Sequence, residues 1–299
     1  MTDRQLQYMI TLSEEGNITT AARKLFISQP SLSALLNHVE QEVGAELFNR
    51  NTTPLSLTAA GKCYIETAHQ ILSLKREMEN HICDIANTKK SSLHIGCGTQ
   101  LSAVLYPKIL PCFMRDYPDV SLHLVEDSFL NLCTQLHKGD LDLVVANRSV
   151  SQQTIDSLPL YREELTLVVP EDITFDALSD DQHLFPVIHP EELCRHPFIL
   201  VKKGQNLRKC IDEFFHQYHI SPEIILETNN WDTCYQMVSQ HMGFTIVPYA
   251  SVYNSLPQEH IRRYSLPGRQ FREIRIFWSK KSYISTAMQH FIHLAQSGF

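Results

Sequence analysis

The sequence predicts a multidomain α+β protein with an N-terminal winged helix-turn-helix, a long linker helix and a C-terminal two-lobed α/β domain. Three patterns support this fold class. Two helical patterns meet at a short turn near residue 27, an apolar stripe at spacings of four and three residues covers 64–85, and strands alternate with helices from residue 93 onward. Such alternation is typical of a mostly parallel sheet with helices on its faces.

The same patterns give the domain boundaries. The run 87–92 is entirely polar and is the expected hinge after the linker helix. The chain crosses twice between the lobes, so the first lobe is split in sequence. We therefore expect a winged helix-turn-helix domain over 1–58, a linker helix and hinge over 59–90, a first lobe over 91–160 and 268–299, and a second lobe over 161–267.

The helix-turn-helix begins with an amphipathic helix over 5–15, which Gly16 and Asn17 break. Thr19 is the expected cap of a short second helix. Two adjacent alanines in that helix are small enough for a third helix to approach closely. The first two helices therefore form the support on which the third helix lies.

The third helix begins at the run 27–33. Ser28 can cap its free N–H groups, and Pro30 falls at the first helical positions, where a missing N–H costs nothing. One face carries an apolar stripe at helical spacing, formed by Leu32, Leu35, Leu36 and Val39. The opposite face carries short polar side chains that can hydrogen-bond to base edges in a DNA major groove: Gln29, Ser31, Ser33, Asn37 and His38.

Residues over 21–61 resemble the N-terminal domain of LysR-type transcriptional regulators. The resemblance is carried by Ala21-Ala22, Leu25, Ser28-Gln29-Pro30-Ser31-Leu32-Ser33, Leu36, Val39-Glu40, Gly44, Leu47-Phe48-Asn49-Arg50 and Leu57-Thr58-Ala59-Ala60-Gly61. It implies a transcriptional regulator rather than an enzyme, with double-stranded DNA and RNA polymerase as partners. It also implies a dimerising linker helix and a periplasmic-binding-protein-like domain that binds a small effector molecule.

The expected DNA interface comprises the third helix, the end of the second helix and a wing over 45–57. Phe48 is expected to anchor the wing, and Arg50 to reach the DNA backbone or minor groove; the alternative for Arg50 is a surface ion pair with Glu46. The family often has a basic residue where this sequence has Ala34. The DNA contacts we expect come from Arg23, Gln29, Pro30, Ser31, Ser33, Asn37 and Arg50.

The net charge of −7 does not by itself indicate a nucleic-acid-binding protein. Residues 1–90 contain nine Lys/Arg and ten Asp/Glu, so this part also lacks a basic excess. DNA binding must then depend on where single cations lie, and we expect a modest salt dependence. The candidates for phosphate contacts are Arg23, Lys24, Arg50 and Lys62.

Thr58 is the expected cap of the linker helix, which can continue to about residue 88. The apolar stripe of this helix has the spacing of a two-helix seam and favours pairing with a second copy. We therefore expect a homodimer, or a homotetramer if the α/β domains also pair. The alternative is an amphipathic helix packed on its own domain. The seam consists of Tyr64, Ala68, Ile71, Lys75, Met78, Ile82 and Ile85.

Polar residues follow several of the predicted strands. Ligands of open α/β sheets bind beyond the carboxyl ends of strands, near helix N-termini with free N–H groups. We therefore expect a small polar or anionic metabolite between the lobes, and no cofactor. The alternative is that Thr99 and Asn206 only cap helices. The expected effector contacts are Thr99, Gln100, Leu101, Ser102, Asn147, Lys203, Gln205, Asn206, Thr228 and Asn229.

Other candidate sites have less support. His216 and His219 lie three residues apart, but we expect no metal site there. Peroxide-sensing members of the family have a reactive cysteine at the position of Asn206, and the nearest thiol here, Cys210, is expected to face the core. The eight cysteines include no CxxC pair, which argues against a zinc ribbon and a disulfide framework.

Two further stretches are interpreted as surface. The stretch 262–281 is locally basic and is expected to be a solvated face rather than a second DNA-binding surface. The stretch 171–192 is longer and more polar than the two-lobed pattern requires, and we expect a surface insertion.

The composition, 43% hydrophobic and 20% charged residues in 299, is that of an ordinary globular protein of two or three domains. No stretch approaches the roughly 20 apolar residues of a membrane span, and no apolar signal segment opens the chain. We expect a cytoplasmic protein without a membrane partner. The second hypothesis is a solute-binding module whose N-terminal helices serve only in oligomerisation. An enzyme finds no support, because nucleophile-elbow, phosphate-loop and paired-carboxylate motifs are missing.

Overall fold

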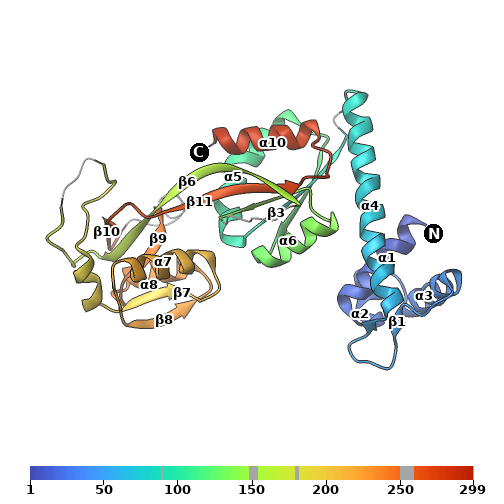
Figure 1. The fold of residues 1–299 in the computed structure, drawn as a ribbon, viewed down its shortest axis with the longest axis horizontal. Coiled ribbons are helices and arrows are strands. Elements are labelled where there is room, and N and C mark those ends of the chain that lie inside the picture. Colours follow the sequence, from blue (N-terminus) through green and yellow to red (C-terminus); the bar gives the residue numbers. More distant parts are fainter. Residues whose placement is uncertain (89, 148–153, 179–181, 250–258, 299) are drawn as a thin grey trace.

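The computed structural model of the chain describes residues 1–88, 90–147, 154–178, 182–249 and 259–298. Three N-terminal helices form one unit, the long helix α4 rises from it, and two α/β lobes follow beyond α4 (Figure 1). This arrangement confirms the predicted fold class. Lys89, part of the expected hinge, lies outside the described residues.

The N-terminal unit contains α1 (Asp3–Glu15), α2 (Ile18–Lys24), α3 (Gln29–Val43), β1 (Phe48–Asn49) and β2 (Ser56–Leu57). Ser28 caps α3 as predicted, because its hydroxyl accepts a hydrogen bond from the Ser31 N–H. The predicted cap of α2 is wrong. The Asn17 side chain accepts hydrogen bonds from the N–H groups of Thr19 and Thr20, so Thr19 already lies inside the first turn.

These helices bury one common core. Leu32, Leu36 and Val39 of α3 contact side chains of the other two helices, while Leu35 is half-buried at the margin. Phe48 of β1 is 1% exposed and attaches the wing to this core, as predicted. Because burial of apolar area is the main favourable term in folding, this aromatic side chain fixes where the wing lies.

Helix α4 (Ala59–Ile85) connects this unit to the lobes. Thr58 caps it as predicted: its hydroxyl accepts a hydrogen bond from the Gly61 N–H at 2.9 Å and donates one to the Glu46 carbonyl at 2.6 Å. A Cβ at Gly61 would lie 2.0 Å from the Leu47 carbonyl oxygen. Only glycine therefore allows the start of α4 to pack this closely on the wing.

Lobe I is a mixed sheet with helices on both faces. Its order is β4 (Ser121–Glu126), β3 (Ser92–Cys97), β5 (Leu143–Ala146), β11 (Phe271–Ser279) and the first part of β6 (Ile155–Pro170). β3, β4 and β5 are parallel, whereas β11 is antiparallel to β5 and β6. Helices α5 (Thr99–Asp116) and α10 (Thr286–Ser297) cover one face, and α6 (Phe129–Lys138) covers the other (Figure 1).

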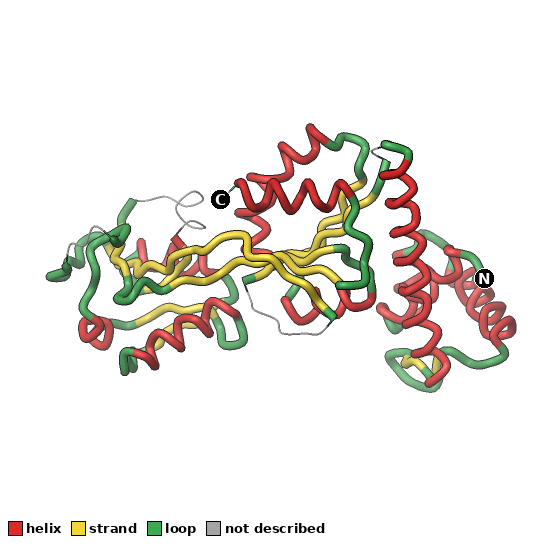
Figure 2. Tube along the Cα trace, turned by 45° about the horizontal axis from the view of Figure 1, so that its top comes forward, coloured by secondary structure: helices red, strands yellow, loops and turns green. Residues whose placement is uncertain are grey.

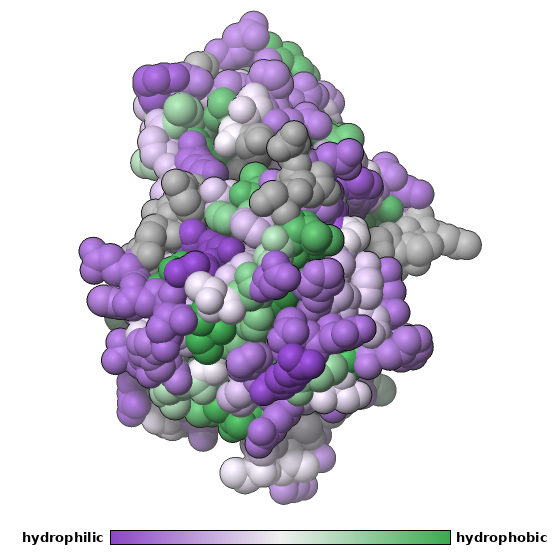
Figure 3. Space-filling model, turned by 90° about the vertical axis from the view of Figure 1, so that its left-hand side faces the viewer, coloured by the Kyte–Doolittle hydropathy of each residue, from purple (hydrophilic) through white to green (hydrophobic). Residues whose placement is uncertain are grey.

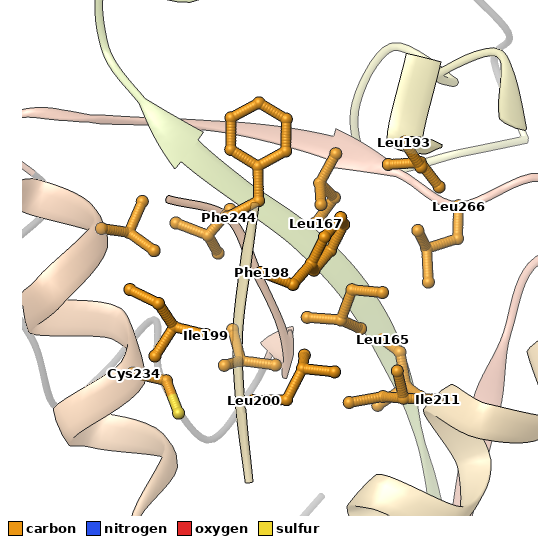
Figure 4. Close-up of a cluster of buried hydrophobic side chains, with 14 of the residues drawn as sticks. Leu165, Leu167, Leu193, Phe198, Ile199, Leu200, Ile211, Cys234, Phe244 and Leu266 are labelled. Atoms are coloured by element: carbon orange, nitrogen blue, oxygen red, sulfur yellow. The ribbon is translucent and has the colours of Figure 1, made fainter. Parts of the chain in front are cut away.

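Lobe II is built around the second part of β6. β9 (Thr245–Pro248) and β10 (Ile261–Ser265) flank β6. β7 (Phe198–Val201) pairs with β8 (Ile224–Thr228) and forms one bridge with Phe244, the residue before β9. The helices among its described residues are α7 (Asn206–Gln217), α8 (Trp231–Ser239) and a 3-10 turn at Pro190–Arg195. Buried side chains from β6, β7, α7 and α8 fill the space between sheet and helices (Figure 4).

The two lobes share continuous strands. β6 pairs with β11 over 155–164 and with β9 and β10 over 165–170, so it runs from one lobe into the other (Figure 2). The register of β11 against β6 shifts between Ile274 and Arg275, which leaves Leu160 as an unpaired bulge residue. The boundary expected between 160 and 161 therefore falls at a bulge inside a strand rather than in a loop.

Helix α4 docks on lobe I mainly through polar groups. His69 Nδ1 lies 2.6 Å from the Asp140 carboxylate, although His69 itself is only 3% exposed. Arg76 donates to the Gly139 carbonyl and lies 3.3 Å from Asp142. Charge-assisted hydrogen bonds of this kind are stronger than neutral ones, so they hold α4 in one orientation.

The docking continues toward the hinge. The Asn80 side-chain amide forms two hydrogen bonds of 3.0 Å with the backbone of Ser92, at the start of β3. Asp84 accepts hydrogen bonds from the Tyr283 hydroxyl and from the backbone and hydroxyl of Thr286, before and at the start of α10. The C-terminal half of α4 is therefore attached to lobe I at several points.

The stretch 171–192 is more than a surface insertion, which corrects the sequence-based expectation. Ile173 and Phe175 pack on the core of lobe II, and Ile188 is 1% exposed. An antiparallel bridge joins Leu178 and Val187. The polar residues between these apolar positions conceal the anchoring pattern in the sequence, and 179–181 lie outside the described residues.

The surface of the molecule is mixed in character. Seen from the lobe II end, hydrophilic residues cover most of the face and hydrophobic residues appear between them in small groups (Figure 3). Among the described helices, none combines the length and the apolar character that a membrane crossing requires.

Two glycines test the docking of α4. Both end a helix in the left-handed conformation, but a Cβ at Gly139 would lie 2.3 Å from the Ser73 hydroxyl oxygen of α4, whereas nothing lies within 4 Å at Gly44. Each substitution by alanine carries backbone strain of about 1–2 kcal/mol. Only Gly139→Ala should also accelerate hydrogen exchange over 69–85 and 92–97. Equal exchange there in Gly139→Ala and Gly44→Ala would contradict the docking.

Candidate functional site: a nucleic-acid interface and an inter-lobe cleft

The outer face of α3 presents the polar side chains predicted from the sequence. Gln29, Pro30, Ser31 and Asn37 are exposed, and Ser33 is half-buried. The Gln29 amide donates to the Ser33 hydroxyl over 3.1 Å, which orients the amide along the helix. Planar amides such as these match the donor and acceptor pattern of adenine in the major groove.

Arg50 of the wing is bound to α3. Its Nη2 lies 2.6 Å from Asn37 Oδ1 and 2.6 Å from Glu40 Oε2. The ion pair considered from the sequence, with Glu46, is therefore replaced by one with Glu40. The Arg50 side chain remains 50% exposed, so its guanidinium is accessible to a phosphate while Glu40 fixes its direction.

Glu40 joins the wing to the recognition helix. Its Oε1 accepts hydrogen bonds from the backbone N–H groups of Leu47 at 2.7 Å and Phe48 at 3.3 Å, while Oε2 binds Arg50. The residue is 9% exposed, and a carboxylate this buried is tolerated only when its oxygens have partners. Its place on the inner face of α3, four residues after Leu36, is the sequence signal that identifies it.

The cations near this face differ in availability. Arg23 and Lys62 are exposed. Lys24 lies 2.7 Å from Glu15, and this hydrogen bond raises the pKa of Lys24. Lys24 and Arg50 are each engaged by an acid of their own domain, whereas Arg23 and Lys62 form no ion pair among the described residues.

Sequence analysis missed Phe26, in the turn before α3. Its side chain is 95% exposed, and its backbone has φ of +54°. A bulky residue in this conformation has a strained backbone. Because the side chain is exposed, no free energy of apolar burial compensates for that strain. No periodicity or polar motif marks this position, because a phenylalanine beside a helix start is read as core.

A cavity of about 690 Å³ lies between the two lobes. The N-terminal ends of α5 and α6 line it from lobe I, and those of α7 and α8 line it from lobe II. Each helix start offers N–H groups and a partial positive charge. The predicted effector contacts that line this cavity are Thr99, Gln100, Leu101, Asn147, Gln205, Asn206 and Asn229.

Three other predicted contacts lie off the cavity wall. Ser102 is 2% exposed, and its hydroxyl donates to Glu126 at 2.6 Å. Lys203 lines a groove on the outer side of α7, and the Thr228 hydroxyl accepts from the Asn230 N–H at 3.3 Å. Neighbouring residues of a helix or strand point in different directions, so a position near the correct strand end is not sufficient.

Thr99 and Asn206 are not helix caps, which removes the alternative interpretation of these two residues. Gly98 and Gln205 occupy the cap positions of α5 and α7, and neither makes a side-chain capping hydrogen bond. The starts of these two helices therefore keep N–H groups that a ligand could use.

Two hydrogen bonds connect the lobes across the cleft. The Asn206 side chain donates to the Asn147 carbonyl, and Gln100 Nε2 donates to Asn230 Oδ1 at 2.7 Å. Each such bond contributes only about 1 kcal/mol net, because water can replace either partner. The side-chain contacts across the cleft are therefore weak, and the paired strands β6 and β11 are the main connection between the lobes.

Sequence analysis also missed the acidic residues of the cleft. Glu126 and Asp127 end and follow β4, and both line the cavity. β4 runs parallel to β3, so its carboxyl end meets the same edge of the sheet. The rule that selected Thr99 after β3 would have selected these carboxylates had it been applied to the second strand.

Arg272 supplies a positive charge at the cavity wall. Its guanidinium lies 2.6 Å from Glu163, with side-chain exposures of 2% and 0%, and 4.8 Å from the centre of the Trp231 ring. Arg263 similarly donates to the Tyr235 hydroxyl at 3.2 Å. The expectation that 262–281 is a solvated face is therefore wrong for these two arginines, which are held by acidic and aromatic partners.

Two cysteines of lobe II, the buried Cys234 and the half-buried Cys210, have thiols that are not activated. Burial raises the pKa of the Cys210 thiol, and it raises the pKa of Cys234 to about 11. A thiol with a raised pKa is little ionised and is a poor nucleophile. Cys210 also packs against the lobe II core, as expected. Over the described ranges, no group of three or more His, Cys, Asp or Glu residues is placed to hold a metal ion.

A winged helix-turn-helix joined by a long helix to two α/β lobes with a cavity between them defines a class of ligand-responsive DNA-binding regulators. Residues 4–62 match the bacterial regulatory helix-turn-helix protein, lysR family, and residues 86–299 match the LysR substrate binding domain. The second match alone covers more than half of the chain. The chain therefore belongs to the LysR family of transcriptional regulators, as the sequence predicted.

Relatives of known sequence agree with this assignment. The chain is 29% identical over 297 residues to the uncharacterized HTH-type transcriptional regulator YybE of Bacillus subtilis, covering 99% of this chain and 98% of YybE. It is 28% identical over 264 residues to a probable RuBisCO transcriptional regulator of Cyanidioschyzon merolae, covering 86% and 85% of the two chains.

Solved structures share the fold. A full-length OxyR variant from Pseudomonas aeruginosa matches with a TM-score of 0.75 at 21% identity, covering 99% of this chain and 95% of that one. CbnR complexed with its target DNA matches with a TM-score of 0.69 at 20% identity, covering 100% of both chains. The fold is thus shared along the whole chain.

Glu40→Ala should destabilise the N-terminal unit. The substitution leaves two buried N–H groups without an acceptor and Arg50 without its partner, at a cost of about 2–3 kcal/mol. Urea unfolding, monitored by hydrogen exchange of residues 29–57, would measure this loss of unfolding free energy. Glu46→Ala is the matched control, since that side chain is exposed. Similar losses in both variants would show that Glu40 does not hold the wing.

Proposed function

We propose that this LysR-type regulator acts in the cytoplasm as a homodimer or homotetramer that binds DNA through α3 and the wing. A small metabolite between the lobes controls it, and RNA polymerase is its further protein partner. The proposal rests chiefly on one observation: a single chain combines the exposed polar face of α3, with Arg50 directed by Glu40, and a cavity between two lobes.

In this proposal α3 lies in the major groove. Gln29, Ser33 and Asn37 contact base edges, Pro30 and Ser31 pack at the start of the helix, and Arg23 and Arg50 bind phosphates. CbnR, which shares the fold, has been solved on its target DNA, and this supports the same use of α3 here. With Ala34 between the polar positions, the contacts are mostly uncharged, which favours a modest salt dependence.

The dimer forms through α4. Leu74, Met78, Ile82 and Ile85 are 65%, 55%, 56% and 72% exposed. They continue the apolar stripe of the first half of α4. That half lines an apolar groove together with Met1 and Val43. Pairing two copies along this stripe would bury apolar area worth about 25 cal/mol per Å². Packing on its own domain accounts only for the first half, where α4 contacts α1.

The cleft provides the control. A metabolite that binds both lobes shifts their relation only if it binds the two arrangements with different affinity. Because α4 docks on lobe I, a change in the lobes alters how two α4 helices, and hence two recognition helices, are placed. A helix-turn-helix dimer binds half-sites at a fixed spacing, so such a change alters DNA binding.

Fluorescence anisotropy on the DNA upstream of its own coding region, beside a scrambled duplex, tests the DNA-binding residues. Gln29→Ala should weaken binding to the specific duplex by about tenfold, since one base contact is worth about 1–3 kcal/mol. Arg50→Ala should weaken both and lower the salt slope by about one. Gln41→Ala, also exposed on α3, is the control. Equal binding to both duplexes at every salt and metabolite tested would favour the solute-binding hypothesis.

Sedimentation velocity tests the α4 pairing. Ile82→Glu places a charge in the proposed seam and should shift the protein toward monomer at micromolar concentration. Leu184→Glu changes a residue with similar exposure, 52%, in lobe II and should leave the assembly unchanged. If Ile82→Glu sediments like the unaltered protein, α4 is not the dimer contact.

A further inference from the structure

The inter-lobe cleft is lined by two acidic side chains and one basic side chain. Glu126, Asp127 and Arg272 line the cavity. Arg272 is bound to Glu163, a carboxylate with 0% exposed side chain, so its charge is balanced within the protein. The charge that remains for a ligand is therefore negative and comes from Glu126 and Asp127. Of the polar or anionic metabolite expected from the sequence, this charge disfavours a purely anionic one and is compatible with a polar one.

Each of the two carboxylates is held in place by hydrogen bonds to one of its two oxygens. Glu126 Oε1 accepts a hydrogen bond from the Ser102 hydroxyl, and Asp127 Oδ1 accepts bonds of 2.6 Å and 2.8 Å from Ser128 N–H and Asn131 Nδ2. Across the described residues, the second oxygen of each makes no hydrogen bond. Two oriented carboxylates that line the cleft give it an acidic subsite for a cationic group, because charge-assisted hydrogen bonds are the strong ones.

A subsite for an anion lies next to them. Helix α5 begins after Gly98 without a side-chain cap, whereas α6 and α8 are capped by Ser128 and Asn230. The N–H groups over 99–101 therefore remain for a ligand carboxylate. Ser102, in the first turn of α5, lies 2.6 Å from Glu126, so the two subsites are adjacent.

The rest of the cavity wall is largely apolar. Leu130 is 73% exposed at this wall although it is a large apolar side chain. Binding sites that combine a few convergent polar groups with apolar walls take small molecules whose body is apolar. The apolar side chains of this wall are Leu101, Phe129, Leu130, Leu132, Ala146, Leu207 and Trp231.

We infer that the cleft binds an α-amino acid with an apolar side chain. The ammonium group lies against Glu126 and Asp127, the carboxylate against the first N–H groups of α5, and the side chain against Phe129, Leu130 and Trp231. The N–H subsite and the carboxylate subsite are adjacent. This arrangement matches an α-amino acid, whose carboxylate and ammonium groups are attached to the same carbon atom. The inference rests on the proposed function, in which this cleft is the effector site, and names the effector class.

Isothermal titration calorimetry on the full-length protein tests this inference. The probes are the standard L-amino acids, followed for each apolar one by the analogue that lacks the ammonium and the amine that lacks the carboxylate. For phenylalanine these are 3-phenylpropanoate and 2-phenylethylamine. At least one apolar amino acid should bind, and either analogue should bind about tenfold more weakly or worse, because each loses charge-assisted contacts.

Substitutions locate the binding. Glu126→Gln and Asp127→Asn should each weaken binding of that amino acid by about tenfold, while Asp119→Asn, an exposed acid of lobe I away from the cleft, should not. Unchanged affinity in both cleft variants would overturn the inference, as would an ammonium-free analogue that binds equally well. If no amino acid binds but sequence-specific DNA binding is intact, this inference fails and the regulator proposal stands. If neither an amino acid nor a specific duplex binds, both the inference and the regulator proposal fail.

Discussion

The polar docking of α4 on lobe I is the interaction on which the working of the molecule depends. The N-terminal end of α4 carries the DNA-binding unit, and the helix is attached to lobe I from its middle to its C-terminal end. The attachment uses His69, Arg76, Asn80 and Asp84. Without this attachment the lobes would be joined to the recognition helices only through the chain that follows α4. The docking therefore makes one mechanical unit of the linker helix and lobe I, while lobe II remains the part that a ligand can move.

Local chemistry explains what could be predicted from the sequence. Caps such as Ser28 and Thr58, the apolar stripe of α3 and the alternation of strands with helices are set by residues close together in the chain, and the structure confirms them. The cleft followed from the rule for strand ends, which placed Thr99 and Asn206 correctly on opposite walls. Asn17 took the place of Thr19 as a cap because two polar residues competed for one local role.

Contacts between distant residues account for what could not be predicted. Glu40 meets the wing, and Arg272 meets Glu163, only after the chain has folded. Spacing along the sequence can place Glu40 on the inner face of α3, but it does not reveal the partner of either residue. Ser102 and Lys203 do not line the cavity for a related reason: each lies near a correctly chosen strand end, but Ser102 donates to Glu126 and Lys203 lines another groove. A buried ion pair therefore appears in the sequence as two ordinary surface charges.

The bulge at Leu160 has a mechanical consequence. The lobes are joined by strands that remain hydrogen-bonded through the crossing, so they cannot swing freely as they would on a loop. A bulge weakens the ladder at one point, and the strand can flex there while its pairing on both sides is kept. Relative motion of the lobes is then a bending of the paired strands β6 and β11 at the bulge. Strands that stay paired on both sides of the bulge resist large bending and return to their original curvature when the ligand leaves. The response to a ligand would therefore be limited in amplitude and reversible.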